Sequence, residues 1–457
     1  MDAHLVAAWE GLCQALAPVF SRPVFGTFVH VLTGWVLCRS RPAVTNLVRT
    51  VGDQLLGQAA KHWTTYQKFF YRANWSLEDL SRQVLLQVVL PTLDACAPGA
   101  QVELKIDDST CARHGRHVAF AGYFKDASAS NTLKTVVHWA HNWVLGCITL
   151  RCSRWPRWVI GLPVWFALYR KAPDCDRAHP FQTRQQLAAQ IIRQTRDLLP
   201  RRALQVAVDG QYATRAVVQA AREADADLVS RLRSDAALYA LPARKPPHRR
   251  GRQAKKGRRL PTPQQMAARR RKGWRTLEVR AYGKVVRRQV LAVVCLWYHV
   301  SRERPIKLLI VRDPTGRQKD DYLFCTEPRV PDAQILEGFA ARWPIEECIR
   351  EAKQLGGFEQ VQGWCPRTVE RQAPLALIGQ TLVKAWYLRY AVAAEAAQPA
   401  SVHGGPGRRD KAHPSYLDML ATLRYALWRH RITPNSTLGA RMHGFLETLR
   451  FTLCAAA

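Results

Sequence analysis

An acidic side chain lies among basic ones between Phe339 and Lys353, at the spacing of a helix. At 100° per residue, Phe339, Arg342, Glu346, Arg350 and Lys353 fall within about 80° of one another. One face of such a helix carries a carboxylate flanked by cations. A solvated helix with surface ion pairs has the same pattern, so this stretch alone does not indicate a site.

Further carboxylates follow strand-like segments far upstream. Asp107 and Asp108 lie near the end of the alternating run 102–110, and Asp209 follows the apolar run 204–208. Functional groups gather beyond the strand ends of an α/β sheet. Together with Glu346, these acids form a set of oxygen ligands of the kind that binds Mg²⁺ or Mn²⁺.

Such ligands suit phosphodiester chemistry. Two ions about 4 Å apart activate a water or a 3′-hydroxyl on one side of a phosphodiester and stabilise the leaving oxygen on the other. The acids therefore predict in-line phosphoryl transfer with two Mg²⁺ or Mn²⁺ ions. Strand alternation does not separate Asp107 from Asp108 as the first ligand, because either side chain could face the metals.

The hydrophobic pattern indicates which elements position the acids. Strand-like runs at 102–110, 143–150 and 158–165 precede a helix at 185–199, and then come a strand at 204–208, a helix at about 213–223 and a strand at 227–230. This order predicts an α/β fold with a mixed sheet whose parallel strands are joined by helices. If the first and fourth of these strands are parallel, their aspartates emerge at the same edge.

The acidic helix itself has clear ends. Pro344 fits the first turn of a helix, and Gly356 and Gly357 suit its end, so Phe339 and Arg342 are expected on the preceding turn. The chain divides into five expected regions: a helical N-terminal region at 1–97 with possible DNA binding, the first part of the catalytic domain at 98–233, a basic β-rich insertion at 234–331, a helix completing the core at 332–360, and a helical C-terminal region at 361–457.

Charge and composition restrict the partner. The 457 residues carry 68 Lys and Arg against 35 Asp and Glu, a net charge of +33, which suits a polyanion such as nucleic acid. The basic run at 244–259 has almost no apolar residues and is expected to be disordered without a partner and to clamp phosphate backbone, with a set of bases that includes Arg249, Arg250, Lys255, Lys256, Arg258 and Arg259.

Compartment and cysteine usage also give expectations. The 12 cysteines form no CxxC pair, so neither a disulfide framework nor a zinc site is predicted, and a reducing cytosol suits them. The N-terminus lacks the basic start of a signal peptide, and 24–38 is too short and too polar to span a bilayer. We expect a cytoplasmic, nucleoid-associated bacterial protein with no membrane partner.

The three acidic segments together resemble a known family, the DDE-type insertion-sequence (cut-and-paste) transposases, whose catalytic domain has a ribonuclease-H-like fold. The third acidic motif of that family is Tyr, two residues, Arg, three residues, Glu, six residues, Lys. Phe339, Arg342, Glu346 and Lys353 match this spacing, with Phe in place of Tyr. Ile-Asp-Asp-Ser-Thr around Asp107 looks like the first acidic motif, and Val-Asp-Gly-Gln-Tyr around Asp209 looks like the second.

The resemblance implies roles for individual residues. Asp209, Glu346 and Asp107, preferred over Asp108, would be the metal ligands of a catalytic set that includes all four acids. Arg342 and Lys353 would hold the backbone of a DNA end, with Phe339 and Arg350 on the same DNA-binding face, although Phe339 lacks the hydroxyl that a tyrosine offers to phosphate.

The function implied is a DNA transposase that binds the terminal inverted repeats of its element, cleaves there and joins the ends to target DNA, as a homodimer on DNA. One alternative is a structure-specific endonuclease on the same fold, since the metal site alone would hydrolyse DNA without joining it. Another is a DNA-binding protein that has lost activity.

Overall fold

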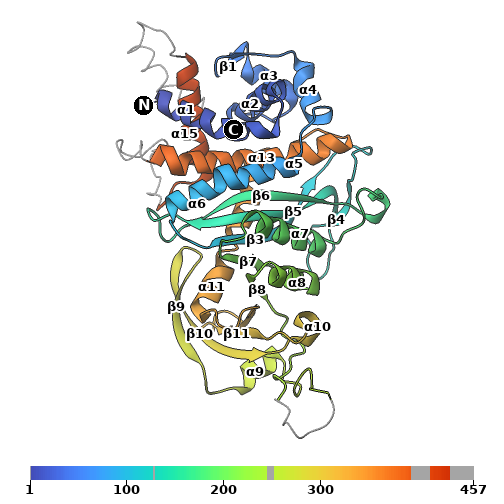
Figure 1. Ribbon diagram of the computed structural model, residues 1–457, viewed down its shortest axis with the longest axis vertical. Helices are drawn as coiled ribbons and strands as arrows, with labels where there is room; N and C mark the ends of the chain where they lie inside the picture. Colours follow the sequence, from blue (N-terminus) through green and yellow to red (C-terminus); the bar gives the residue numbers. More distant parts are fainter. Residues whose placement is uncertain (1, 127–128, 244–251, 393–411, 433–457) are drawn as a thin grey trace.

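One mixed sheet forms the centre of the computed structural model, which describes residues 2–126, 129–243, 252–392 and 412–432 (Figure 1). Its strands run in the spatial order β4, β5, β3, β7, β8, β12, β11, β10, β9, and β6 pairs with β5. Their bounds are β3 Val102–Ala112, β4 Gly122–Lys125, β5 Val137–Arg151, β6 Val159–Tyr169, β7 Leu204–Val208, β8 Ala226–Arg231, β9 Arg275–Ala281, β10 Lys284–Cys295, β11 Ile306–Arg312 and β12 Asp321–Cys325. Strands β3, β7 and β8 are parallel, and the other pairs are antiparallel.

The parallel register of β3 and β7 places two of the acids. Val102 pairs with Leu204, and the pairing continues to Ile106 and Val208, the last residue of β7. The next residues along the two strands are Asp107 and Asp209. These aspartates therefore occupy equivalent positions at the same edge of the sheet, as expected for neighbouring parallel strands.

Helices cover both faces of the sheet (Figure 1). On one side lie α7 (Arg184–Leu198), which begins with a capping box of Thr183 and Gln186, and α8 (Arg215–Glu223). The other side is covered by α12 (Pro344–Gln354) and α13 (Pro366–Trp386). The result is a mixed α/β fold of largely antiparallel pairing, consistent with a ribonuclease-H-like DDE nuclease.

Two further helices, α5 (Leu77–Gln83) and α6 (Leu90–Cys96), lie beside α13 against β6 and β5 (Figure 1). A layer beyond α13 holds α1 (Asp2–Gln14), α2 (Arg22–Leu37), α3 (Val44–Val51), α4 (Trp63–Tyr71) and α15 (Tyr416–Ile432), with a small hairpin of β1 (Gln54–Leu55) and β2 (Gln58–Ala59). In α4, the aromatic side chains of Tyr66, Phe69 and Phe70 are buried, so this helix packs mainly as a core element.

The strands expected at 234–331 do not form a separate body. β12 pairs with β8, and β11, β10 and β9 continue the same sheet outward, with short helices α9 (Pro263–Arg269) and α10 (Tyr298–Ser301) beside them. Helix α11 (Asp332–Ala340) then returns the chain to the sheet centre. The expected disorder of the basic run is wrong for 252–259, because the backbone of Gly257 and Arg258 bonds to Ala240. The segment 244–251 lies outside the described residues.

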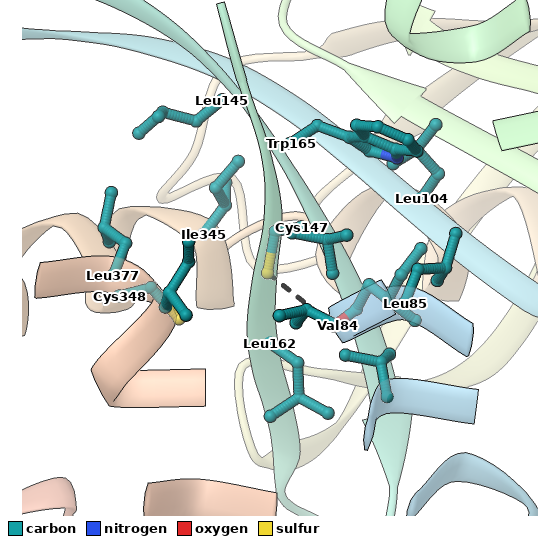
Figure 2. Close-up of a cluster of buried hydrophobic side chains, with 14 of the residues drawn as sticks. Val84, Leu85, Leu104, Leu145, Cys147, Leu162, Trp165, Ile345, Cys348 and Leu377 are labelled. Atoms are coloured by element: carbon teal, nitrogen blue, oxygen red, sulfur yellow. Dashed lines mark hydrogen bonds between the residues drawn. The ribbon is translucent and has the colours of Figure 1, made fainter. Parts of the chain in front are cut away.

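Helix α12 is fixed by close packing against β5 and β6. Figure 2 shows Ile345 and Cys348 of α12 beside Cys147 and Leu162 in one apolar cluster. The Cys348 thiol donates to the carbonyl of Gly161 at 3.3 Å. A methyl group added at Gly161 would lie 2.7 Å from Cys348 Sγ and 3.0 Å from the Pro344 carbonyl oxygen, so the start of α12 approaches β6 as closely as only glycine permits.

The eleven cysteines in the described ranges are free thiols, most of them buried. None of the helices in these ranges combines the length and the apolar character that a membrane crossing needs.

Candidate functional site

Arg342 joins two of the predicted acids. Its Nη1 lies 2.8 Å from Asp107 Oδ2, and its Nη2 lies 2.6 Å from Glu346 Oε1. Asp107 belongs to β3 and Glu346 to the first turn of α12, where the helix dipole favours a carboxylate. The Arg342 and Asp107 side chains are 11% and 15% exposed, so the bridge is largely shielded from water. Asp107 and Arg342, 235 positions apart in the sequence, are thus in direct contact.

Burial makes Asp107 an unusual carboxyl group. Loss of solvation raises the pKa of Asp107 to about 7, Arg342 opposes the rise, and the neighbouring charges of Asp108 and Glu346 add to it. At this shielded position, the charged form of the Asp107 carboxyl group needs a neighbouring cation to be stable. Arg342 supplies that cation here.

Asp209 comes from the neighbouring strand with its backbone tightly held. The Asp209 carbonyl oxygen accepts bonds from Ser230 Oγ at 3.1 Å and from the amide of Tyr212 at 2.9 Å. Among cations, Arg231 lies near it: burial would lower the pKa of Arg231, but Asp321, Tyr282 and Asp209 raise it. Asp209 therefore sits at the same sheet edge as Asp107, though outside the Arg342 bridge.

Asp108 is engaged elsewhere. Its Oδ2 accepts from Arg184 Nη1 at 2.7 Å and from Asn142 Nδ2 at 2.8 Å, and its Oδ1 accepts from the Tyr212 hydroxyl at 2.7 Å. Arg184 begins α7, on the face of the sheet opposite α12. Successive side chains of a strand point to opposite faces, which is why Asp107 meets Arg342 and Asp108 does not.

The other members of the predicted basic face are placed differently. Phe339 is only 6% exposed and packs in the core, with the guanidinium groups of Arg231 and Arg342 5.3 and 5.8 Å from its ring centre. Direct DNA contact by Phe339 is therefore not what the geometry favours. Lys353 pairs with Glu359 at 2.9 Å, whereas Arg350 is exposed and 3.8 Å from Glu347.

Of the predicted basic run, Lys255 and Lys256 lie beside α10. Lys255 forms an ion pair with Glu303, and Lys256 lies 4.2 Å from the ring centre of Tyr239. Arg258 and Arg259 are exposed. Arg249 and Arg250 fall outside the described residues.

A basic and aromatic cleft begins beside Arg342. A pocket of about 430 Å³ is lined by Arg231, Tyr282, Phe339, Arg342 and Trp343. Tyr282 and Trp343 also line a neighbouring cleft of about 630 Å³. Its lining includes one carboxylate, Glu347, and five basic side chains, those of Arg151, Arg154, Arg157, Arg280 and Lys284. Cations and exposed rings beside carboxylates provide contacts for both phosphates and bases of a nucleic acid.

The donor set fits a hard divalent cation by chemistry. The three acids supply only oxygen atoms, and the Arg342 guanidinium shows that a cation is already accommodated between two of them. Within the described ranges, no group of three or more His, Cys, Asp and Glu is arranged to hold a metal. The Arg342 guanidinium occupies the place between Asp107 and Glu346 that a metal held by both carboxylates would take.

Sequence reasoning missed the partners of Asp108. Asn142, Arg184 and Tyr212 come from three separate segments and meet only through the sheet and α7. Tyr212 could have been considered from the sequence, because it lies three residues after Asp209 in the Val-Asp-Gly-Gln-Tyr motif. A tyrosine directly after a strand end is a common core residue, so nothing in the local pattern indicated its role.

Comparison with known families identifies the matched part of the chain. The model of a family described as DDE superfamily endonuclease matches residues 15–286, which include Asp107, Asp108 and Asp209 and stop before Glu346. A search of curated proteins finds no match. Such nucleases generally use divalent metal ions and act on DNA. Since the matched region spans more than half of the 457 residues, the chain belongs to the DDE superfamily endonuclease family.

Proposed function

We propose that this protein is a DNA transposase that cleaves the terminal inverted repeats of its element and joins them to target DNA. The observation that carries the proposal is the meeting of Asp107, within β3, and Glu346 on Arg342, next to the end of β7 that Asp209 follows. The net charge of +33 supports DNA as the partner.

Asp107, Asp209 and Glu346 would hold two Mg²⁺ or Mn²⁺ ions. When bound, such ions supply Lewis-acid stabilisation of the phosphodiester oxygens and a nucleophile at neutral pH. Asp108 is not among the proposed ligands, because Arg184, Asn142 and Tyr212 already engage both of its oxygens.

The basic residues have binding roles. Once the Arg342 guanidinium leaves the two acids, its planar fork suits the two oxygens of a phosphate close to them. Arg350 and the bases of the cleft beside Trp343 would hold the backbone of the DNA end. Lys353 must first leave Glu359, so we expect a smaller contribution from Lys353 than from Arg350.

Strand transfer is the decisive test. A labelled duplex carrying an end of the element is incubated with the protein, Mg²⁺ and a supercoiled plasmid, and covalently joined product is expected. Asp107→Asn, Asp209→Asn and Glu346→Gln should each abolish cleavage while retaining DNA affinity in EDTA. Asp94→Asn serves as the control, because Asp94 is an exposed carboxylate on α6 that pairs with Arg202 and is not among the proposed ligands.

A structure-specific endonuclease is the second candidate, because the family match is to endonucleases. Nicked or cut DNA without any joined product would favour it. A variant set in which all four acids are dispensable for cleavage would contradict both candidates.

A further inference from the structure

The carboxylate of Asp108 is the centre of a buried clamp. Four donors reach it: Arg184 at 2.7 Å, Asn142 at 2.8 Å, the Tyr212 hydroxyl at 2.7 Å and Gln211 Nε2 at 3.3 Å. The Asp108 side chain is 8% exposed. Hydrogen bonds to a shielded charged group are among the strongest in proteins, so these donors are held firmly.

The clamp reaches the segment that carries Asp209. Gln211 and Tyr212 belong to the single helical turn Gly210–Tyr212 that follows Asp209. Tyr212 is fully buried, and its amide bonds to the Asp209 carbonyl at 2.9 Å. One residue thus joins the backbone of Asp209 to the side chain of Asp108.

The Tyr212 hydroxyl is the donor of this connection, because the Asp108 carboxylate that it meets at 2.7 Å can only accept. Phenylalanine at this position would keep the ring in the core and lose only the bond to Asp108.

We propose that Asp108 and Tyr212 are positioning residues that set the location of the Asp209 carboxylate relative to Asp107. Asp107 and Asp108 are adjacent on β3. The clamp therefore fixes Asp209 relative to the strand that carries the first proposed ligand. This inference rests on the proposed metal-dependent function. Partners that orient metal ligands typically contribute about 10-fold to 100-fold to metal affinity.

The test compares two buried tyrosines. Tyr212→Phe removes the hydroxyl bond to Asp108, and Tyr66→Phe removes a hydroxyl bonded to the amide of Lys61 and to His30 at 3.0 Å, in the N-terminal helical layer. Binding of Mn²⁺ is measured on the full chain without DNA, from the electron paramagnetic resonance signal of free Mn²⁺. Thermal unfolding in EDTA is measured on the same samples.

We expect Tyr212→Phe to weaken Mn²⁺ binding about 10-fold and Tyr66→Phe to leave it unchanged, at similar losses of thermal stability. DNA cleavage by Tyr212→Phe should recover when Mn²⁺ is raised by the same factor. Equal Mn²⁺ affinity of the two variants would overturn the positioning role. If the wild type binds Mn²⁺ no better than Asp107→Asn does, the proposed function itself fails, and the two failures are thereby distinguished.

Discussion

Replacing Arg342 with glutamine should make the stability of the fold depend on a bound metal ion, because the substitution removes the cation between Asp107 and Glu346. The guanidinium makes two charge-assisted bonds, at 2.8 Å to Asp107 and 2.6 Å to Glu346. Arg342→Gln leaves two carboxylates facing each other without that charge. Removing one partner of a buried ion pair costs about 3–5 kcal/mol, and we take the lower end because the Glu346 side chain is 33% exposed.

The size of the thermal shift follows from the chain length. With an unfolding entropy of ~2.1 cal/mol/K per residue, 457 residues give roughly 1 kcal/mol/K, so a loss of ~3 kcal/mol lowers Tm by about 3 °C in EDTA. A divalent ion at 100 times its Kd returns ~2.7 kcal/mol to the folded state. Mg²⁺ or Mn²⁺ should therefore raise Tm of the variant by nearly the amount that the substitution removed.

Differential scanning fluorimetry with and without Mn²⁺ measures both effects. In the wild type the metal must displace the guanidinium, so its Mn²⁺ shift should be smaller than that of Arg342→Gln. Arg350→Gln is the matched control, because Arg350 is exposed on α12, the helix that carries Glu346, and makes only a 3.8 Å ion pair with Glu347. The reasoning is refuted if Arg342→Gln and Arg350→Gln have the same Tm in EDTA and the same response to Mn²⁺.

Three further predictions concern packing, pH and DNA. Gly161→Ala should destabilise the fold by about 1–3 kcal/mol and lower cleavage more than DNA affinity, because the added methyl group would meet backbone at the start of α12. Calorimetry and cleavage assays test this prediction, and an unchanged Tm would contradict it. Burial, with Arg113, lowers the pKa of His141 in the folded protein to about 4. As the pH falls, His141 therefore takes up its proton in the unfolded chain first, so its contribution to the free energy of unfolding is complete above about pH 6.5 and decreases toward pH 4. This loss is about 2 kcal/mol between pH 7.5 and pH 5 in urea titrations, and His141→Gln should remove most of it; an equal loss in that variant would show that other groups cause it. Arg258→Ala combined with Arg259→Ala should reduce the slope of log K against log salt by about 1.8 if both touch phosphates, and an unchanged slope would remove this segment from the DNA interface.

The sequence predicted the parts of the site that depend on local pattern. Asp209 follows the apolar run that forms β7, as predicted, whereas the expected strand end at Asp107 and Asp108 is wrong, because β3 continues to Ala112. The limits of α12 followed from Pro344 and the glycines after its end, because these residues act through their own backbone preferences.

What depends on long-range packing was not predictable in the same way. Asp107 and Asp108 were equivalent in the sequence, and only the different coverings of the two sheet faces, α12 on one and α7 on the other, separated them. Phe339 matched the spacing of a DNA-facing aromatic, yet tertiary packing buries it beneath two guanidinium groups. The strands at 234–331 had the right periodicity, but periodicity carries no information on which sheet they join.

The placement of Glu346 depends on two contacts outside the acidic residues themselves. Lys105, fully buried on β3 two residues before Asp107, donates to the Gly338 carbonyl of α11 at 3.2 Å and pairs with Glu103 at 2.9 Å. Gly161 receives the start of α12 at contact distance. The first contact fixes where the chain arrives after β12, and the second fixes the helix that follows. Because Glu346 lies on a helix and not on a strand, its position relative to Asp107 is set by these packing contacts rather than by the strand register that aligns the two aspartates.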